Sequence, residues 1–143
     1  MFIGEFNYKI DSKKRLAVPA KFRDDLDGKV VVTRGLDGCL FLYTLDEWEK
    51  LAEKISSLPL SQANARSFAR VMLAGAMELE LDSSGRILLP DYLKEYADLE
   101  KDVVIAGVYN RMEIWDKDEW EDYKEEAESD VGDVAEGLKE LGV

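Results

Sequence analysis

The chain has 143 residues, 46% of them hydrophobic, which is enough for one domain or for two small halves that share a core. A single cysteine (Cys39) excludes an internal disulfide bond, and the absence of histidine removes the commonest metal ligand and general base. No apolar run approaches the ~20 residues that span a bilayer, so we expect a cytoplasmic protein without a membrane partner. We also expect no metal site and no cofactor, and the sequence implies no small-molecule ligand.

The net charge alone does not exclude a nucleic-acid partner, because the charges are unevenly distributed along the chain. A formal net charge of −12 by itself argues against a nucleic-acid partner. However, thirteen acidic residues and three lysines give residues 113–143 a net charge of −10. Between Lys9 and Arg23, six basic residues stand against Asp11, which gives a local charge of +5. The chain can therefore present a basic face to DNA in spite of its acidic total.

The first half of the chain alternates predicted strands and turns and ends in a helix. Apolar residues at even positions predict a strand over 2–10, and the polar residues 11–14 predict a turn. The elements predicted next are a strand over 15–18, a short helix over 20–26 and strands over 29–34 and 39–43. Thr44 and Glu47 form a capping box, which opens a helix that continues to about Ile55.

A predicted helix over 61–74 leads to a second half in which the same order returns. Its predicted elements are strands over 76–81, 103–108 and 112–115, with a short helix over 91–99. Asp116 and Glu119 form a second capping box, ahead of another helix. Beyond it, Val134, Leu138 and Leu141 follow helical spacing, whereas the glycine and acidic content argues against a stable helix.

One short motif is present twice. Residues 11–19, DSKKRLAVP, are matched 71 positions later by residues 82–90, DSSGRILLP. Further matches at a shift of 72 include Trp48 with Trp120. Matches in the same order indicate an internal duplication. We therefore predict a first repeat over 1–58, a connecting helix over 59–75, a second repeat over 76–129 and an acidic tail over 130–143.

The first copy of the motif is the candidate binding site. Asp and Ser start turns by hydrogen-bonding to nearby backbone groups, so Asp11 is expected to fix the turn or orient the arginine. A hairpin that carries arginine can enter the DNA major groove, where arginine contacts guanine edges and lysine neutralises phosphate. With Arg15 as the main contact, the predicted DNA-binding residues are Arg15, Lys13, Lys14, Lys9, Lys21 and Arg23.

The second copy is expected to be mainly structural. It contains Asp82, Gly85 and Arg86, but serine and glycine replace the lysines of the first copy. Glu78 and Glu80 precede it and make its surroundings acidic.

There are two other interpretations of the charged residues besides DNA binding. A basic turn can simply be a solvated hairpin without a ligand. Glu78 and Glu80 could perform acid–base chemistry, but residues two apart on a strand share one face, which here is expected to be solvent. No P-loop, nucleophile elbow or zinc-protease pattern is present, so we expect no catalytic residue. Trp48, Trp120 and Cys39 are expected to be packing residues.

The duplicated turns, the start Met1-Phe2-Ile3-Gly4 and the pair Trp115-Asp116 resemble the MraZ family, and the resemblance extends to about Glu128. It implies an α+β fold, mainly β, in which two tandem AbrB-like, swapped-hairpin repeats form a β-barrel-like core with flanking helices. It also implies a ring-shaped homo-oligomer associated with the nucleoid. That ring would regulate transcription, as a repressor, by binding short direct repeats in the promoter of the operon for cell division and cell-wall synthesis, which includes its own gene.

One position departs from the family's pattern. The first motif usually has glycine before its arginine, and here Lys14 occupies that position. If the turn requires a positive φ there, lysine costs roughly 1 kcal/mol relative to glycine. The alternative function is a ring-forming interaction scaffold whose turns close the barrel without contacting DNA.

Overall fold

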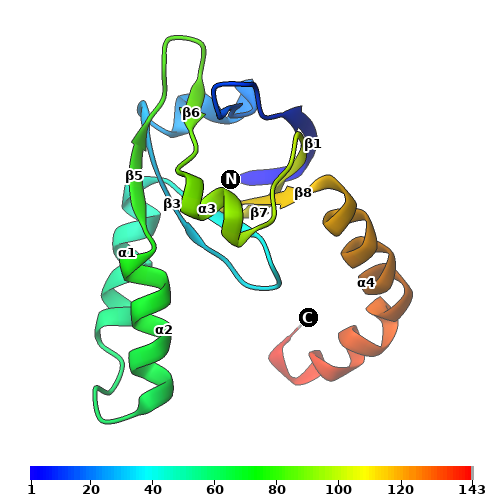
Figure 1. The fold of residues 1–143 in the computed structure, drawn as a ribbon. Helices are drawn as coiled ribbons and strands as arrows, with labels where there is room; N and C mark the ends of the chain where they lie inside the picture. Colours follow the sequence, from blue (N-terminus) through cyan, green and yellow to red (C-terminus); the bar gives the residue numbers. More distant parts are fainter. Residues whose placement is uncertain (143) are drawn as a thin grey trace.

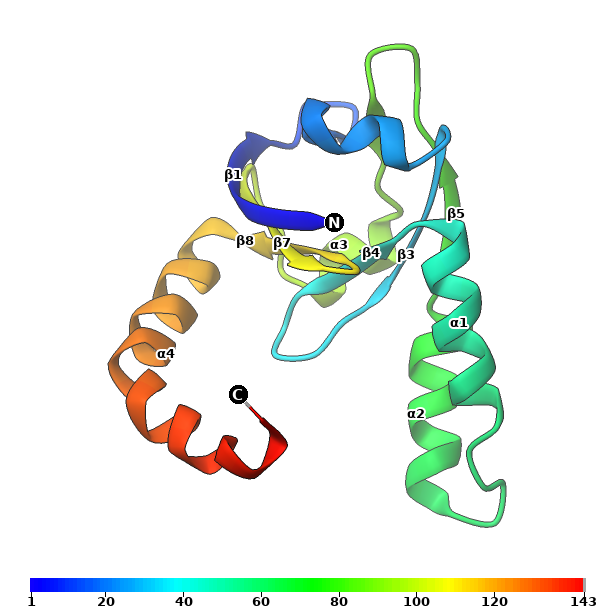
Figure 2. The same ribbon diagram turned by 180° about the vertical axis from the view of Figure 1, so that it is seen from behind.

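The computed structural model describes residues 1–142, which form one six-stranded antiparallel sheet, one two-stranded sheet and flanking helices (Figures 1 and 2). The strands are β1 (Phe2–Lys9), β2 (Arg15–Ala17), β3 (Lys29–Arg34), β4 (Leu40–Tyr43), β5 (Met77–Glu80), β6 (Arg86–Leu88), β7 (Asp102–Tyr109) and β8 (Met112–Asp116). The α-helices are α1 (Leu45–Ser56), α2 (Ala63–Ala74), α3 (Asp91–Tyr96) and α4 (Lys117–Gly137), and the 3-10 helices are η1 (Ala20–Asp25) and η2 (Lys139–Leu141).

The two repeats exchange strands. In the large sheet, with order β1-β7-β8-β4-β3-β5, the first strand of each repeat pairs with a strand of the other repeat. Thus β1 pairs with β7, and β5 pairs with β3. At the centre β4 pairs with β8, where Phe41 lies opposite Glu113, its equivalent at the shift of 72. The fold is therefore an α+β arrangement of two interlocked repeats, as predicted.

The strands β2 and β6, which follow the two turns, form a sheet of their own. Leu16 lies opposite Ile87, and these residues are equivalent positions in the two copies. Both are fully buried. Just beyond the strands, the Val18 amide donates to the Gly85 carbonyl and the Leu89 amide donates to the Lys14 carbonyl. The pairing has local two-fold symmetry, and it places the two turns next to each other.

The expected barrel is not closed. Within residues 1–142, β1 and β5 stand at the two ends of the large sheet and do not pair with each other. The physical reason is that the chain turns away after each of these strands. The hydrogen-bonding groups of β2 and β6 are then used by each other instead of joining the ends of the large sheet.

The core has two parts, one on each side of the large sheet. The larger part lies between the large sheet, η1 and the β2–β6 pair, where the Phe22 ring packs edge-on against Phe2 and Phe6 at 5.1 and 5.3 Å. The smaller part includes Phe41 and Trp115 and is covered by side chains of α1, α2 and α4. Trp48 and Trp120 are half-buried against it, and Cys39 is buried, as predicted for packing residues.

The helix boundaries differ from the predictions at several points. The helix predicted over 91–99 ends at Tyr96, and the one predicted over 20–26 is a 3-10 helix that ends at Asp25. The Thr44 hydroxyl accepts the Glu47 amide at 3.1 Å, which confirms the capping residue of α1. Helix α2 begins at Ala63, two residues later than predicted, and no side chain caps it. Helix α4 continues through the expected start of the tail at residue 130 and ends at Gly137, although none of its residues is buried. In α4 the capping oxygen of Asp116 accepts the amide of Asp118 at 3.2 Å.

Within residues 1–142, no helix combines the length and the apolar character that crossing a bilayer requires.

Candidate nucleic-acid interface

The first turn is held by the carboxylate of Asp11. One oxygen of Asp11 accepts the backbone amides of Lys13 and Arg15, each at 2.9 Å. The other oxygen accepts the Arg15 Nε–H at 2.6 Å. A single carboxylate therefore fixes both the backbone of the turn and the direction of the guanidinium, as an aspartate that starts a turn can do. Asp11 therefore makes the contacts expected of a residue that fixes the turn and orients the arginine.

The second turn repeats this geometry. Asp82 Oδ1 accepts the amides of Ser84 and Arg86, each at 2.9 Å. Asp82 Oδ2 accepts the Arg86 Nε–H, also at 2.9 Å. The two copies of the motif thus build the same hydrogen-bonded turn, although their second and third polar residues differ.

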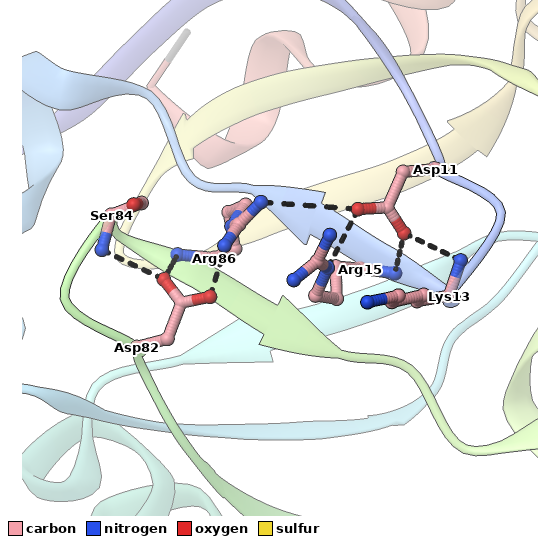
Figure 3. A network of polar contacts seen from close by, with 6 residues as sticks. All are labelled: Asp11, Lys13, Arg15, Asp82, Ser84 and Arg86. Atoms are coloured by element: carbon pink, nitrogen blue, oxygen red, sulfur yellow. Dashed lines mark hydrogen bonds and ion pairs between the residues drawn. The ribbon is translucent and has the colours of Figure 1, made fainter.

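The two arginines lie side by side between the two aspartates, on the pair β2–β6 (Figure 3). The Arg86 Nη1 atom lies 3.9 Å from Asp11 Oδ2, which links the turns across the two-fold relation. The side chains of Arg15 and Arg86 are 32% and 33% exposed. The Nε–H of each arginine donates to an aspartate, and about one third of each side chain remains accessible to a ligand.

The hydrogen bonds of the turns lower the pKa of both aspartates. For Asp11 the main cause is the amide of Arg15, followed by the guanidinium of the same residue, and burial acts in the opposite direction. The pKa of Asp82 is lowered in the same way, mainly by the amide of Arg86. Both carboxylates therefore remain charged, and the pairs with arginine persist, at neutral pH.

Lys14 adopts the conformation that the family's glycine would favour. Its φ is +63°, and the equivalent Gly85 has a φ of +75°. The lysine therefore bears the strain considered above, about 1 kcal/mol relative to glycine. Its ammonium group lies 2.6 Å from Asp91 at the start of α3, and this contact lowers the pKa of Asp91.

Arg23 supports the second turn from η1. Its Nε–H donates to the Val18 carbonyl at 2.9 Å, and a Cβ atom added at Gly85 would collide with its guanidinium. Glycine is needed at position 85 for this close approach as well as for its φ. Arg23 therefore has a packing role in addition to any contact with a ligand.

The remaining predicted site residues are spread over several elements. Lys13 is exposed within the first turn. Lys9, at the end of β1, lies 3.8 Å from Asp102 on β7. The ammonium group of Lys21 lies over the rings of Phe6 and Phe22, at 5.7 and 5.6 Å from their centroids. Of the predicted set, the structure brings Arg15, Arg86 and the two aspartates into direct contact, with Arg23 beside Gly85.

A family model described as "MraZ protein, putative antitoxin-like" matches residues 1–71 and 72–140. The chain belongs to the MraZ family. Curated relatives of the same 143-residue length, each aligned over all of both chains, are named "Transcriptional regulator MraZ". They come from Natranaerobius thermophilus and Clostridium beijerinckii, each 51% identical, and from Pediococcus pentosaceus, 50% identical.

The two MraZ matches agree with the internal duplication. They meet between Val71 and Met72, inside α2, and each contains one copy of the aspartate–arginine turn. The resemblance to the MraZ family that the two motifs indicated is thereby confirmed. Each match covers one repeat of the sequence and contains one complete hairpin, β3–β4 or β7–β8. The other strand pairs join the two matches, because β1 and β5 are exchanged.

The sequence predicted a structural role for Arg86 and a DNA-binding role for Arg15. In the structure the two arginines have the same hydrogen-bonded geometry and lie side by side. The prediction for Arg86 was based on the acidic residues around the second turn and on the absence of lysines in it. Glu78 and Glu80 are exposed on β5, as expected, and neither is hydrogen-bonded to Arg86. The pairing of β2 with β6 could not be predicted from the sequence, because it joins segments about seventy positions apart.

Proposed function

We propose that this MraZ chain is a sequence-specific DNA-binding transcriptional regulator, and that the β2–β6 pair presents its reading surface. The observation that carries the proposal is the pair of arginine side chains, each about one third exposed and each held by its own aspartate. The names of the relatives support regulation of transcription as the biological role.

A fixed guanidinium suits recognition of guanine. Arginine reads guanine by donating two parallel hydrogen bonds to O6 and N7 in the major groove. In each turn the aspartate accepts a hydrogen bond from Nε and not from a terminal nitrogen. The terminal nitrogens can therefore donate to a base, although Arg86 Nη1 also lies 3.9 Å from Asp11 Oδ2. Because the side chain is already held in one direction, less conformational entropy is lost when DNA binds. We therefore include Arg86 with Arg15 in the reading surface.

In this proposal the lysines contact the phosphates of the DNA backbone. Lys13 and Lys14 lie in the first turn itself, and Lys9, Lys21 and Arg23 lie on the elements next to it. Such side chains neutralise phosphates without reading the sequence, and they make binding sensitive to salt. The second turn has no lysine, so the phosphate contacts are expected to be asymmetric about the two-fold relation.

A ring of copies would compensate for the small size of one basic surface. We propose, as the MraZ family implies, that the ring is a homo-oligomer that engages short direct repeats in the promoter of the division and cell-wall operon. Several weak contacts held together gain affinity through effective concentration when the geometry lets them bind at once. The expected effect is repression of the operon that contains the chain's own gene, by a cytoplasmic, nucleoid-associated protein.

Binding to the protein's own promoter region tests the proposal. Wild type and Arg15→Ala are compared at two salt concentrations, with a shuffled duplex as competitor. Loss of a bidentate arginine costs about 1–3 kcal/mol, or roughly 5- to 150-fold in affinity per site. Lys50→Ala on α1 removes a remote positive charge and serves as the control. Equal binding by wild type and Arg15→Ala would contradict the proposal, and a folded ring without DNA affinity would favour the scaffold.

A further inference from the structure

The two lysines of the first turn have different surroundings. Lys13 is exposed, and among residues 1–142 no carboxylate lies within ion-pair distance of its ammonium group. The ammonium group of Lys14 lies 2.6 Å from Asp91 Oδ1, at the start of α3. Both side chains of this ion pair reach solvent, since they are 48% and 64% exposed. Two adjacent residues of the same type are therefore in different electrostatic states.

Lys14 also lines a hollow that is rich in acidic side chains. The hollow has a volume of about 440 Å³ and lies between β5 and the segment that joins β6 to α3. Its acidic side chains are Glu78, Glu80 and Asp91. Among the described residues that line it, Lys14 alone is basic. Three carboxylates thus share this hollow with one ammonium group, and their negative charge opposes the approach of a DNA phosphate.

The second turn has neither member of this ion pair. At the shift of 71 that aligns the two motifs, Lys14 corresponds to Gly85 and Asp91 corresponds to Ala20. The equivalence is structural as well, because the carbonyls of positions 14 and 85 each accept a backbone amide from the other copy of the motif. The lysine and the aspartate therefore occur together on one side of the two-fold relation, and glycine and alanine replace both on the other side.

A DNA phosphate and Asp91 are alternative partners for Lys14. Exposed ion pairs contribute little to the stability of a fold, because water screens the charges and two flexible side chains have to be ordered. A phosphate offers the ammonium group the same kind of contact, and its neutralisation also releases condensed counterions. A phosphate that approached Lys14 while Asp91 stayed in place would meet the like charge of the carboxylate. The two contacts therefore exclude each other.

We propose that Asp91 competes with the phosphates of DNA for Lys14 and so limits the affinity of the first turn. In the free chain Lys14 is held by Asp91, and in the complex it exchanges the carboxylate for a phosphate. Lys13 contacts phosphate without such an exchange. Asp91 is thus a positioning residue that acts on DNA through Lys14. The inference rests on the proposed function, and it assigns a separate task to each lysine of the turn.

Fluorescence anisotropy titrations with promoter and shuffled duplexes, at several salt concentrations, test the competition. Asp91→Asn keeps the shape of the side chain and removes its charge. It is expected to bind both duplexes roughly two- to fivefold more tightly than wild type, because phosphates are present in every sequence. The gain is expected to shrink as salt is added, since the contact between lysine and phosphate is screened. Loss of a merely structural contact would not strengthen binding.

Three further variants control for net charge, chemistry and folding. Glu95→Gln makes the same change of charge one turn further along α3, and within the described part of the chain Glu95 forms no ion pair. It is expected to bind within about 1.5-fold of wild type. Asp91→Glu restores the carboxylate and is expected to bind like wild type. Asp91→Ser also lacks the carboxylate, and it replaces Asp91→Asn if circular dichroism shows that the latter is unfolded. A gain in Glu95→Gln equal to that in Asp91→Asn would assign the effect to net charge and overturn the proposal.

A double-mutant cycle with Lys14→Gln decides whether the effect passes through Lys14. In the Lys14→Gln background, Asp91→Asn is expected to change the affinity by less than about 1.5-fold, because the ammonium group for which the partners compete is gone. A gain of the same size with and without Lys14 is incompatible with the competition. Unchanged or weaker binding of Asp91→Asn in the wild-type background also overturns it.

Arg15→Ala, measured in the same titrations, separates this inference from the proposed function. If Arg15→Ala loses promoter binding while Asp91→Asn gains none, the reading surface stands and the competition is wrong. If Arg15→Ala binds like wild type, the proposed reading surface is wrong, whereas the cycle of Lys14 and Asp91 still reports on the competition. A wild-type chain without affinity for DNA overturns both proposals.

Discussion

Arg86 Nη1 lies 3.9 Å from Asp11 Oδ2, so the arginine of one turn approaches the aspartate of the other. Asp11 thus faces both guanidiniums, because its Oδ2 also accepts the Arg15 Nε–H. Within the proposed reading surface, Asp11 would thus be a positioning residue for both arginines.

We expect Asp11→Asn to weaken binding to promoter DNA by roughly tenfold, about 1.4 kcal/mol. The asparagine oxygen can still accept the turn amides, but the charge that holds the guanidiniums is lost. A duplex titration by fluorescence anisotropy measures the change. Glu47→Gln, which removes only the partner of Lys50 on α1, is the control and is expected to bind like wild type. Unchanged affinity in Asp11→Asn would show that Asp11 does not position the arginines.

The lowered pKa values of Asp11 and Asp82 predict a pH dependence of stability. Their pKa lies below the ordinary value of 3.8 in the folded chain, so the stabilisation is present above that value. It is lost as the pH falls through the lower, folded-state values. Urea unfolding from about pH 5 downward is expected to show a difference between wild type and the double variant Asp11→Asn, Asp82→Asn that shrinks with acidity. A constant difference would contradict the role of the two charges.

The positive φ of Lys14 predicts a comparison between two substitutions. Lys14→Gly and Lys14→Ala both remove the contact with Asp91, so they differ mainly in backbone strain. We expect the glycine variant to be more stable than the alanine variant by about 1 kcal/mol, measured by denaturant unfolding. Gly85→Ala is expected to destabilise the chain, because its Cβ collides with Arg23. An alanine variant as stable as the glycine variant would mean that the turn relaxes.

Lys13 allows phosphate contact to be separated from base reading. Lys13→Ala is expected to weaken specific and shuffled duplexes equally and to reduce the slope of log K against log salt by about 1. Arg15→Ala is expected to reduce the preference for the promoter sequence instead. Titrations at several salt concentrations give both quantities. A loss of sequence preference in Lys13→Ala would place Lys13 among the base contacts.

The exchange of strands predicts how the repeats behave when separated. Residues 1–58 contain β1 without its partner β7, and residues 76–129 contain β5 without its partner β3. We expect neither fragment to fold as a monomer, because an unpaired strand leaves backbone groups and the core exposed. Mixing residues 1–71 with 72–142 is expected to restore the circular dichroism spectrum of the full chain. A stable, monomeric 1–58 fragment would show that the repeats are independent.

The sequence by itself determined the local features of this protein. The caps of α1 and α4 and the turn in which Asp11 holds Arg15 depend on residues at most a few positions apart. The duplication is visible because the same motif is written twice. Side chains that hydrogen-bond to nearby backbone groups leave a recognisable spacing, and the repeated motif was enough to indicate the MraZ family. The sequence also marked position 14 as the one where a positive φ would be strained, and Lys14 has that φ.

Only the tertiary structure decided which strands pair and which side chains meet. The pairing of β1 with β7, the open sheet in place of a closed barrel and the placement of Arg86 beside Arg15 join segments about seventy to one hundred positions apart. Alternating apolar residues define which face of a strand is buried, but they do not select its neighbour. That choice follows from burying both repeats in one core, with Leu16 against Ile87 at its two-fold centre.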